Sequence, residues 1–179
     1  KHSRREHLND FHLNVAGEYV YDGALYACQN DDAKQRRSKR AVWGMAAILT
    51  VAVAAGGCIP APGMQNCFYV LLPYLGEFLG AASVIWALAK LGTDWSTVRE
   101  YNYKKSVAVL PVRTAVTAVF SLLGIVCELI FFFVNDHAGQ TFFALLYVLL
   151  KLIALLSVLV LRAEIMQAEW DKLPKKDNF

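Results

Sequence analysis

The sequence predicts an all-α integral membrane protein, a four-helix transmembrane bundle preceded by a short cytoplasmic N-terminal segment. Of the 179 residues, 56% are apolar and only 18% are charged, whereas a soluble domain usually carries about 25% charge. The shortfall is confined to four long apolar runs. Each run is close to the ~20 residues that an α-helix needs to cross a hydrocarbon core of ~30 Å.

The four runs divide the chain. We expect membrane spans at about 41–59, 68–91, 114–134 and 141–161. All are longer than the 10–14 residues typical of a buried helix in a soluble protein. The first run leads directly into another span, so it does not resemble a removable signal peptide. The chain therefore reads as an N-terminal segment (1–40), a transmembrane domain (41–161) and a C-terminal tail (162–179).

The basic residues predict the orientation. Of the 18 Lys and Arg residues, eight precede the first span, five lie between spans two and three or at their edges, and four follow the fourth span. The loops near 60–66 and 135–140 contain none. The positive-inside rule therefore places both termini and the middle loop in the cytoplasm. We expect a plasma membrane or a bacterial-type inner membrane.

A basic cluster ends the N-terminal segment. It comprises Arg36, Arg37, Lys39 and Arg40, directly before the first span. Such residues can hold anionic lipid headgroups, at about 1 kcal/mol each. The alternative is a topology anchor with no further role. The net charge of +3 arises from these flanks and gives no indication of nucleic-acid binding.

The N-terminal segment has a strand pattern. Phe11, Leu13 and Val15 alternate with polar residues, which is the period of a β-strand. The stretches 19–21 and 24–26 flank Asp22-Gly23, a pair that favours a hairpin turn. We predict a small β-hairpin or extended segment under the bundle. A helix that runs into the first span is the alternative.

The spans and their connections follow from local residues. Span one is rich in small residues, mainly Gly and Ala, which let membrane helices approach closely. The first outer loop is short, so spans one and two should be antiparallel neighbours. Pro73 predicts a kink in span two. In the middle loop Asp94 is the expected N-cap of a short helix, and the tail has a helical pattern through about Leu173.

Three charged residues lie inside the apolar runs, namely Glu77, Glu128 and Lys151. A charge at bilayer depth costs a few kcal/mol, so such residues usually face a bundle interior and find partners there. Glu77 and Lys151 lie roughly 15 Å from the outer ends of their spans, and Glu128 roughly 10 Å. Small or polar residues share their helix faces. We therefore expect one shared cluster in the outer half of the membrane.

The cluster has two interpretations. Two carboxylates that share one lysine cannot all stay charged without cost, so one can take up and release a proton. The cluster is then a binding or proton-coupling site. Alternatively, Glu77 or Glu128 forms a buried pair with Lys151 that fixes the helix register.

The remaining reactive residues indicate little chemistry. Cys58 and Cys67 bracket the first outer loop, and a disulfide between them is plausible on the oxidising side. The histidines have no zinc-site spacing, so we expect no metal and no cofactor. Phosphate-loop, G-x-S-x-G and H-E-x-x-H motifs are absent.

Two functions are compatible with this sequence. The first is a transporter or channel-like protein for a small solute or ion, with Glu77, Glu128 and Lys151 as its site. It would form a homo-oligomer, because four helices enclose little volume. The second is a non-catalytic accessory or structural membrane protein, a partner subunit that docks through its N-terminal segment. An enzyme is the least favoured class.

Overall fold

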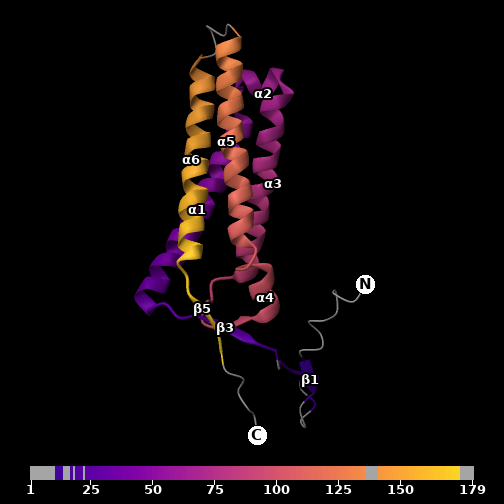
Figure 1. The fold of residues 1–179 in the computed structure, drawn as a ribbon, viewed down its shortest axis with the longest axis vertical. Helices are drawn as coiled ribbons and strands as arrows, with labels where there is room; N and C mark the ends of the chain where they lie inside the picture. Colours follow the sequence, from indigo (N-terminus) through magenta and orange to yellow (C-terminus); the bar gives the residue numbers. More distant parts are fainter. Residues whose placement is uncertain (1–10, 14–16, 18, 22, 136–140, 174–179) are drawn as a thin grey trace.

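The computed structural model describes residues 11–13, 17, 19–21, 23–135 and 141–173. Its helices are α1 (Asp32–Cys58), α2 (Pro62–Asn66), α3 (Phe68–Leu91), α4 (Glu100–Lys105), α5 (Leu110–Val134) and α6 (Thr141–Met166). Its strands are β1 (Phe11–Leu13), β2 (Tyr19–Tyr21), β3 (Leu25–Cys28), β4 (Val98–Arg99) and β5 (Trp170–Lys172). The long helices form one bundle with α2 at one end and β3, β4 and β5 at the other (Figure 1). We call these the α2 end and the sheet end.

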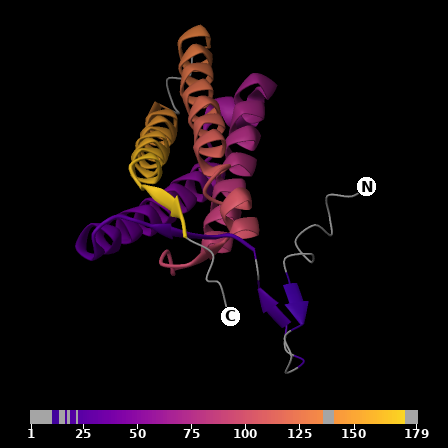
Figure 2. The same cartoon turned by 60° about the horizontal axis from the view of Figure 1, so that its bottom comes forward.

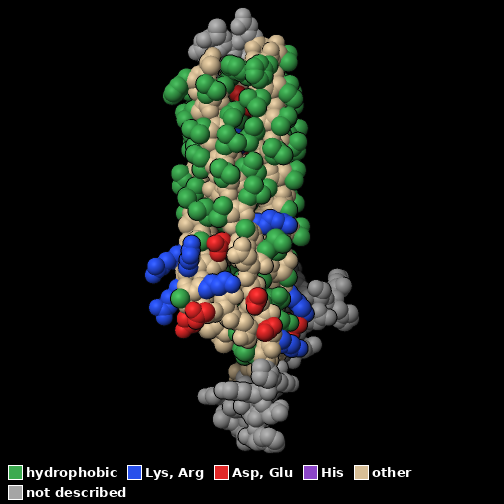
Figure 3. Space-filling view, turned by 60° about the vertical axis from the view of Figure 1, so that its left-hand side comes forward, with side chains coloured by type: hydrophobic (Ala, Val, Ile, Leu, Met, Phe, Trp, Pro, Cys, Tyr) green, Lys and Arg blue, Asp and Glu red, His purple; other side chains and the backbone are tan. Residues whose placement is uncertain are grey.

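The predicted helix bundle is confirmed. α1, α3, α6 and the segment 100–134, which contains α5, are long and apolar enough to cross a membrane. This indicates a membrane location. Hydrophobic side chains cover the visible face of the bundle, whereas Lys, Arg, Asp and Glu gather at the sheet end (Figure 3). Such an apolar belt is the surface that a lipid environment requires.

The helices are not arranged around the bundle in the order in which they follow one another in the sequence. α6 packs between α1 and α5, and α5 packs between α6 and α3. α1 and α3 are in contact, as expected of consecutive spans, but the main partner of α1 is α6. α3 is continuous through Pro73.

α1 is longer than the first apolar run. It begins at Asp32, so the basic cluster 36–40 belongs to the helix and not to a preceding loop. Lys, Arg and Gln are good helix formers, and an acidic residue in the first turn favours the helix dipole. The first turns of α1 project sideways at the sheet end (Figures 1 and 2).

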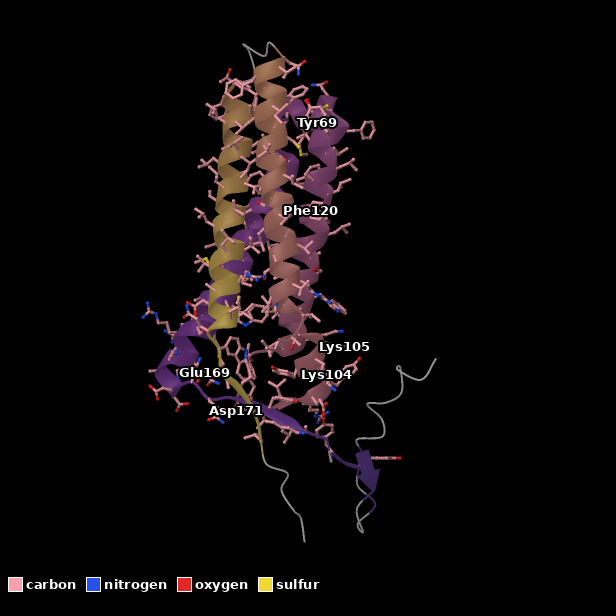
Figure 4. The ribbon with its side chains drawn as sticks, viewed as in Figure 1. Tyr69, Lys104, Lys105, Phe120, Glu169 and Asp171 are labelled. Atoms are coloured by element: carbon pink, nitrogen blue, oxygen red, sulfur yellow. The ribbon has the colours of Figure 1, made fainter. Side chains whose placement is uncertain are left out.

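Small residues bring α3 and α5 close together. A Cβ added to Gly76 would lie 2.5 Å from the ring of Phe120, which Figure 4 labels on α5. A Cβ at Gly80 would lie 2.6 Å from the Thr117 hydroxyl. The predicted role of small residues in close helix packing therefore applies to this pair.

Two arginines tie the helices together toward the sheet end. Arg113 of α5 donates a hydrogen bond of 2.7 Å to the Ser83 carbonyl of α3. Arg162 of α6 donates to the Pro111 carbonyl at the start of α5. Both side chains are half-buried. Each satisfies a backbone carbonyl across a helix–helix interface.

The sheet end is a three-stranded antiparallel sheet in the order β4–β3–β5. Trp95 is buried beneath the bundle, and its ring lies 5.8 Å from that of Trp170 on β5. Tyr26 of β3 stacks on Tyr103 of α4 at 4.2 Å. Figure 4 shows Lys104 and Lys105 on α4 beside this sheet, with Glu169 and Asp171 on the tail. The tail thus closes the sheet end.

Two expectations for the loop and tail are wrong. Asp94 does not cap a helix, because its carboxylate accepts hydrogen bonds from the Ser96 amide at 3.0 Å and hydroxyl at 2.6 Å. These bonds hold the pKa of Asp94 below its usual value, and the short helix begins only at Glu100. The tail is not helical through Leu173. α6 ends at Met166, because the following residues pair with β3 instead.

The N-terminal strands form, but their pairing differs from the prediction. β1 and β2 are antiparallel neighbours, with Phe11 opposite Tyr21. β3 pairs with β4 and β5, so it is not the partner of β2. The predicted Asp22-Gly23 turn includes a residue outside the described part of the chain. The alternative was a helix that runs from this segment into the first span. It is wrong for residues 25–28, which form β3, because α1 begins only at Asp32.

Candidate functional site

The centre of the site is an ion pair between α6 and α3. The Lys151 ammonium contacts the Glu77 carboxylate. Both side chains are almost completely buried, with relative exposures of 3% for Lys151 and 0% for Glu77. Of the three charged residues expected to meet inside the bundle, the structure brings these two together. An ion pair removed from water is held strongly, because breaking it leaves an uncompensated buried charge.

Two tyrosine rings flank the lysine. The Lys151 ammonium lies 4.6 Å from the ring centroid of Tyr74 on α3 and 5.2 Å from that of Tyr147 on α6. Cation–π attraction to desolvated rings stabilises a buried ammonium. The Tyr74 hydroxyl donates a hydrogen bond of 3.3 Å to the Val53 carbonyl on α1. One of the two rings beside the lysine is therefore anchored to a further helix, α1.

Helix α5 makes room for the lysine. A Cβ added to Gly124 would lie 3.4 Å from Lys151 Cε and 3.6 Å from its ammonium. One turn earlier, the Ser121 hydroxyl donates a hydrogen bond of 3.2 Å to the Lys151 carbonyl. These residues lie on the face of α5 that also carries Glu128. The small, polar stripe predicted there is in contact with α6.

Glu128 has a separate partner. It is fully buried on α5, and its carboxylate accepts a long hydrogen bond of 3.4 Å from the Gly63 amide in α2. A Cβ at Gly63 would overlap this carboxylate, so only glycine allows so close an approach. Among the described residues no ion pair joins Glu128 to Lys151. The lysine is therefore paired with one glutamate and not shared between two.

Three polar atoms of the site have no hydrogen-bond partner in the described structure. They are Glu77 Oε1, Glu128 Oε2 and the Tyr147 hydroxyl, and all three are buried. A buried polar atom without a partner costs about 1–3 kcal/mol. We call Glu77, Glu128, Tyr147 and Lys151 the buried polar cluster. Such an arrangement can accept a proton or a water, since Glu128 has no ion-pair partner among the described residues and keeps one oxygen without a hydrogen bond.

Sequence reasoning found the charges but not the residues that hold them. It assigned no role to Tyr74 or Tyr147, whose rings flank Lys151 in the structure. Their spacing, three and four residues from the charges, could have marked them as partners. Gly63 gave no signal, because its contact with Glu128 spans 65 residues of sequence.

The cysteines do not form the predicted disulfide in this structure. Cys58 at the end of α1 is exposed, Cys67 before α3 is half-buried, and both are free thiols. The connection between them folds into the helical turn α2, whose Ala61 and Pro62 are buried in the bundle end. The segment is thus held by packing. Among the described residues, no three His, Cys, Asp or Glu side chains are grouped as metal ligands.

The structure separates the residues expected at lipid headgroups. Arg36, Arg37 and Arg40 are exposed and line a surface hollow of about 530 Å³ together with Asp32 and Ala33. Lys39 instead lies over the Trp95 ring, 5.7 Å from its centroid. Lys39 therefore belongs to the contact between α1 and the sheet end.

Comparisons with known proteins add nothing to this geometry: no protein-family model, no curated protein and no solved structure matches the chain.

Proposed function

We propose that this chain is a small polytopic membrane protein that moves a small solute or ion, with the buried polar cluster as its proton-coupling site. The observation that supports this proposal is the set of three buried polar atoms without partners around a single Glu–Lys pair. A purely structural pair gains nothing from leaving such atoms unsatisfied, since each one costs free energy.

The charges of the cluster assign roles to its members. Glu77 is the charged partner of Lys151, because their contact compensates both charges. Glu128 is left with one long hydrogen bond from an uncharged amide. Glu128 is therefore the carboxyl that binds and releases the proton, and the Tyr147 hydroxyl, which is buried without a hydrogen-bond partner, is a candidate to relay it. The full burial of the cluster matches an occluded state, closed to water on both sides.

The proposed topology places the cluster in the outer half of a membrane. The sheet end, with its Lys and Arg residues, faces the cytoplasm and the α2 end faces outward. Both termini are then cytoplasmic, in a plasma membrane or a bacterial-type inner membrane. The lipid bilayer is the main partner of the apolar belt. A homo-oligomer or a partner membrane protein would complete a pathway that four helices alone are too few to enclose.

Proton flux in liposomes tests this function. The purified protein is reconstituted with a pH-sensitive dye in the lumen, and an imposed pH gradient drives the flux. Glu77→Gln and Glu128→Gln should reduce the flux to the level of empty liposomes. Glu100→Gln, which removes an acidic group at the sheet end, is the matched control and should leave the flux unchanged.

The second candidate is a non-catalytic accessory membrane protein. Complete burial of Glu77, Glu128 and Lys151 favours it, because a structural pair needs no access to water. In that case the charges fix the helix register, and the N-terminal segment is the docking surface. This alternative replaces the transport proposal if Glu77→Gln and Lys151→Met shift the melting temperature but have the same flux as the wild type. It also replaces that proposal if the wild type conducts no protons.

A further inference from the structure

The exposed face at the start of α1 has the properties of a lipid-binding surface. Arg36, Arg37 and Arg40 are exposed, while Ser38 and Val42 on the other side of the helix are buried in the bundle. The three guanidinium groups therefore point away from the protein core. They line the surface hollow of about 530 Å³ at the sheet end.

The hollow carries uncompensated positive charge. Three arginines and the single carboxylate of Asp32 leave it with a net charge of +2. In the described part of the chain these arginines form no ion pair. An arginine fork matches the oxygen atoms of a phosphate group and can bind two of them at once.

The same helix face becomes apolar immediately beyond the arginines. Gly44 follows Arg40 by one turn, and a Cβ added there would meet nothing within 4 Å. Ile48 and Val51 continue the face with exposures of 43% and 67%. Arg36 and Arg40 are within about 6 Å along the helix axis. Both side chains are therefore close enough together to reach the headgroup of one lipid.

We propose that Arg36, Arg37 and Arg40 bind the phosphate of an anionic lipid whose acyl chains lie along Gly44, Ile48 and Val51. A free phosphate shares the charged half of this chemistry, but it would not use the apolar continuation of the face. Lys39 is not part of the site, because its contact with Trp95 faces the sheet end. That contact instead fixes the rotation of α1 about its axis, which keeps the arginines outward.

Lipid retention tests the site. The full chain is reconstituted in nanodiscs of phosphatidylcholine with a minor share of phosphatidylglycerol, and lipids that remain bound are counted by native mass spectrometry. We expect R36Q/R37Q/R40Q to reduce bound phosphatidylglycerol by at least about tenfold, since each basic residue contributes about 1 kcal/mol. The matched control K34Q/K105Q/K172Q removes the same charge outside the hollow and should retain the lipid.

Two further arms decide the interpretation. R36K/R37K/R40K keeps the charge, and hence the orientation of the chain, but loses the fork; it should bind phosphatidylglycerol at a level between the wild type and the Gln variant. Inorganic phosphate should not displace the lipid. Equal loss of lipid in the control variant would overturn the proposal in favour of diffuse charge. Displacement by inorganic phosphate would overturn it in favour of a free-anion site.

Discussion

Lys151 is the residue on which the buried polar cluster depends. Its ammonium is the only positive charge found in contact with Glu77 among the described residues. We predict that Lys151→Met lowers the free energy of unfolding by about 3–5 kcal/mol, because it leaves the Glu77 carboxylate buried and unpaired. The measurement is equilibrium unfolding in detergent micelles.

A second variant separates this cause from a general packing defect. In Lys151→Met/Glu77→Met both charges are replaced by apolar groups, so the desolvation cost disappears. We expect the double variant to be at least as stable as the wild type. If the two single losses simply add in the double variant, the pair is not coupled and the assignment is wrong.

Gly63 is the residue that fits Glu128 to α2. An added Cβ would overlap the Glu128 carboxylate and lie 3.1 Å from Val70. We predict that Gly63→Ala costs about 1–3 kcal/mol, because overpacking displaces the carboxylate from the Gly63 amide. Gly44→Ala is the control, since that position is open; it should be neutral or stabilise the helix by up to about 1 kcal/mol. Equal costs at both glycines would show that the contact with Glu128 is immaterial.

At the scale of the elements, periodicity and apolar length were sufficient for the long helices but not for the short segments. The four runs predicted α1, α3, α5 and α6, because each buries a face against its neighbours over many turns. β5 could not be predicted from 170–172 alone, since its conformation is determined by pairing with β3 some 145 residues earlier. The local pattern of the tail predicted a helix because it contains no information about this distant pairing.

The candidate site could likewise be predicted only in part. The cost of charge in an apolar run identified Glu77, Glu128 and Lys151 from the sequence alone. The sequence could not predict which glutamate pairs with the lysine, because Glu77, Glu128 and Lys151 lie at the same depth in their helices to within a turn or two. The neighbour order α1–α6–α5–α3 and the position of α2 decide it.

The element most open to test is β5. Trp170 packs against Trp95 at 5.8 Å and against Tyr103 at 5.9 Å. We predict that Trp170→Ala detaches β5 and speeds hydrogen exchange at the amides of β3, because aromatic contacts hold the edge strand. Exchange in α5 and α6 near Lys151 should not change, since Arg162 still ties α6 to α5. Faster exchange in both regions would mean that the sheet end and the buried polar cluster form one cooperative unit.

The whole molecule has three polar levels along one apolar bundle. The buried polar cluster lies toward the α2 end, Arg113 and Arg162 tie the helices farther along, and the sheet end closes the opposite side. Between the first two levels, the fully buried side chains of Leu49 and Val158 pack in the bundle together with the buried hydroxyl groups of Thr117 and Ser157. If Glu128 binds a proton as proposed, the nearest end of the bundle is the α2 end, because the Glu128 carboxylate contacts Gly63 of α2.

Glu128 is the carboxyl that we propose binds and releases a proton inside the bundle. Infrared difference spectroscopy of the reconstituted protein measures this directly, because a protonated carboxyl and a carboxylate absorb at different frequencies. On lowering the pH from neutral to mildly acidic, we predict a buried carboxyl band in the wild type and in Glu100→Gln that is missing from Glu128→Gln. A spectrum in which Glu128→Gln retains the whole band of the wild type would show that Glu128 is not the carboxyl that takes up the proton.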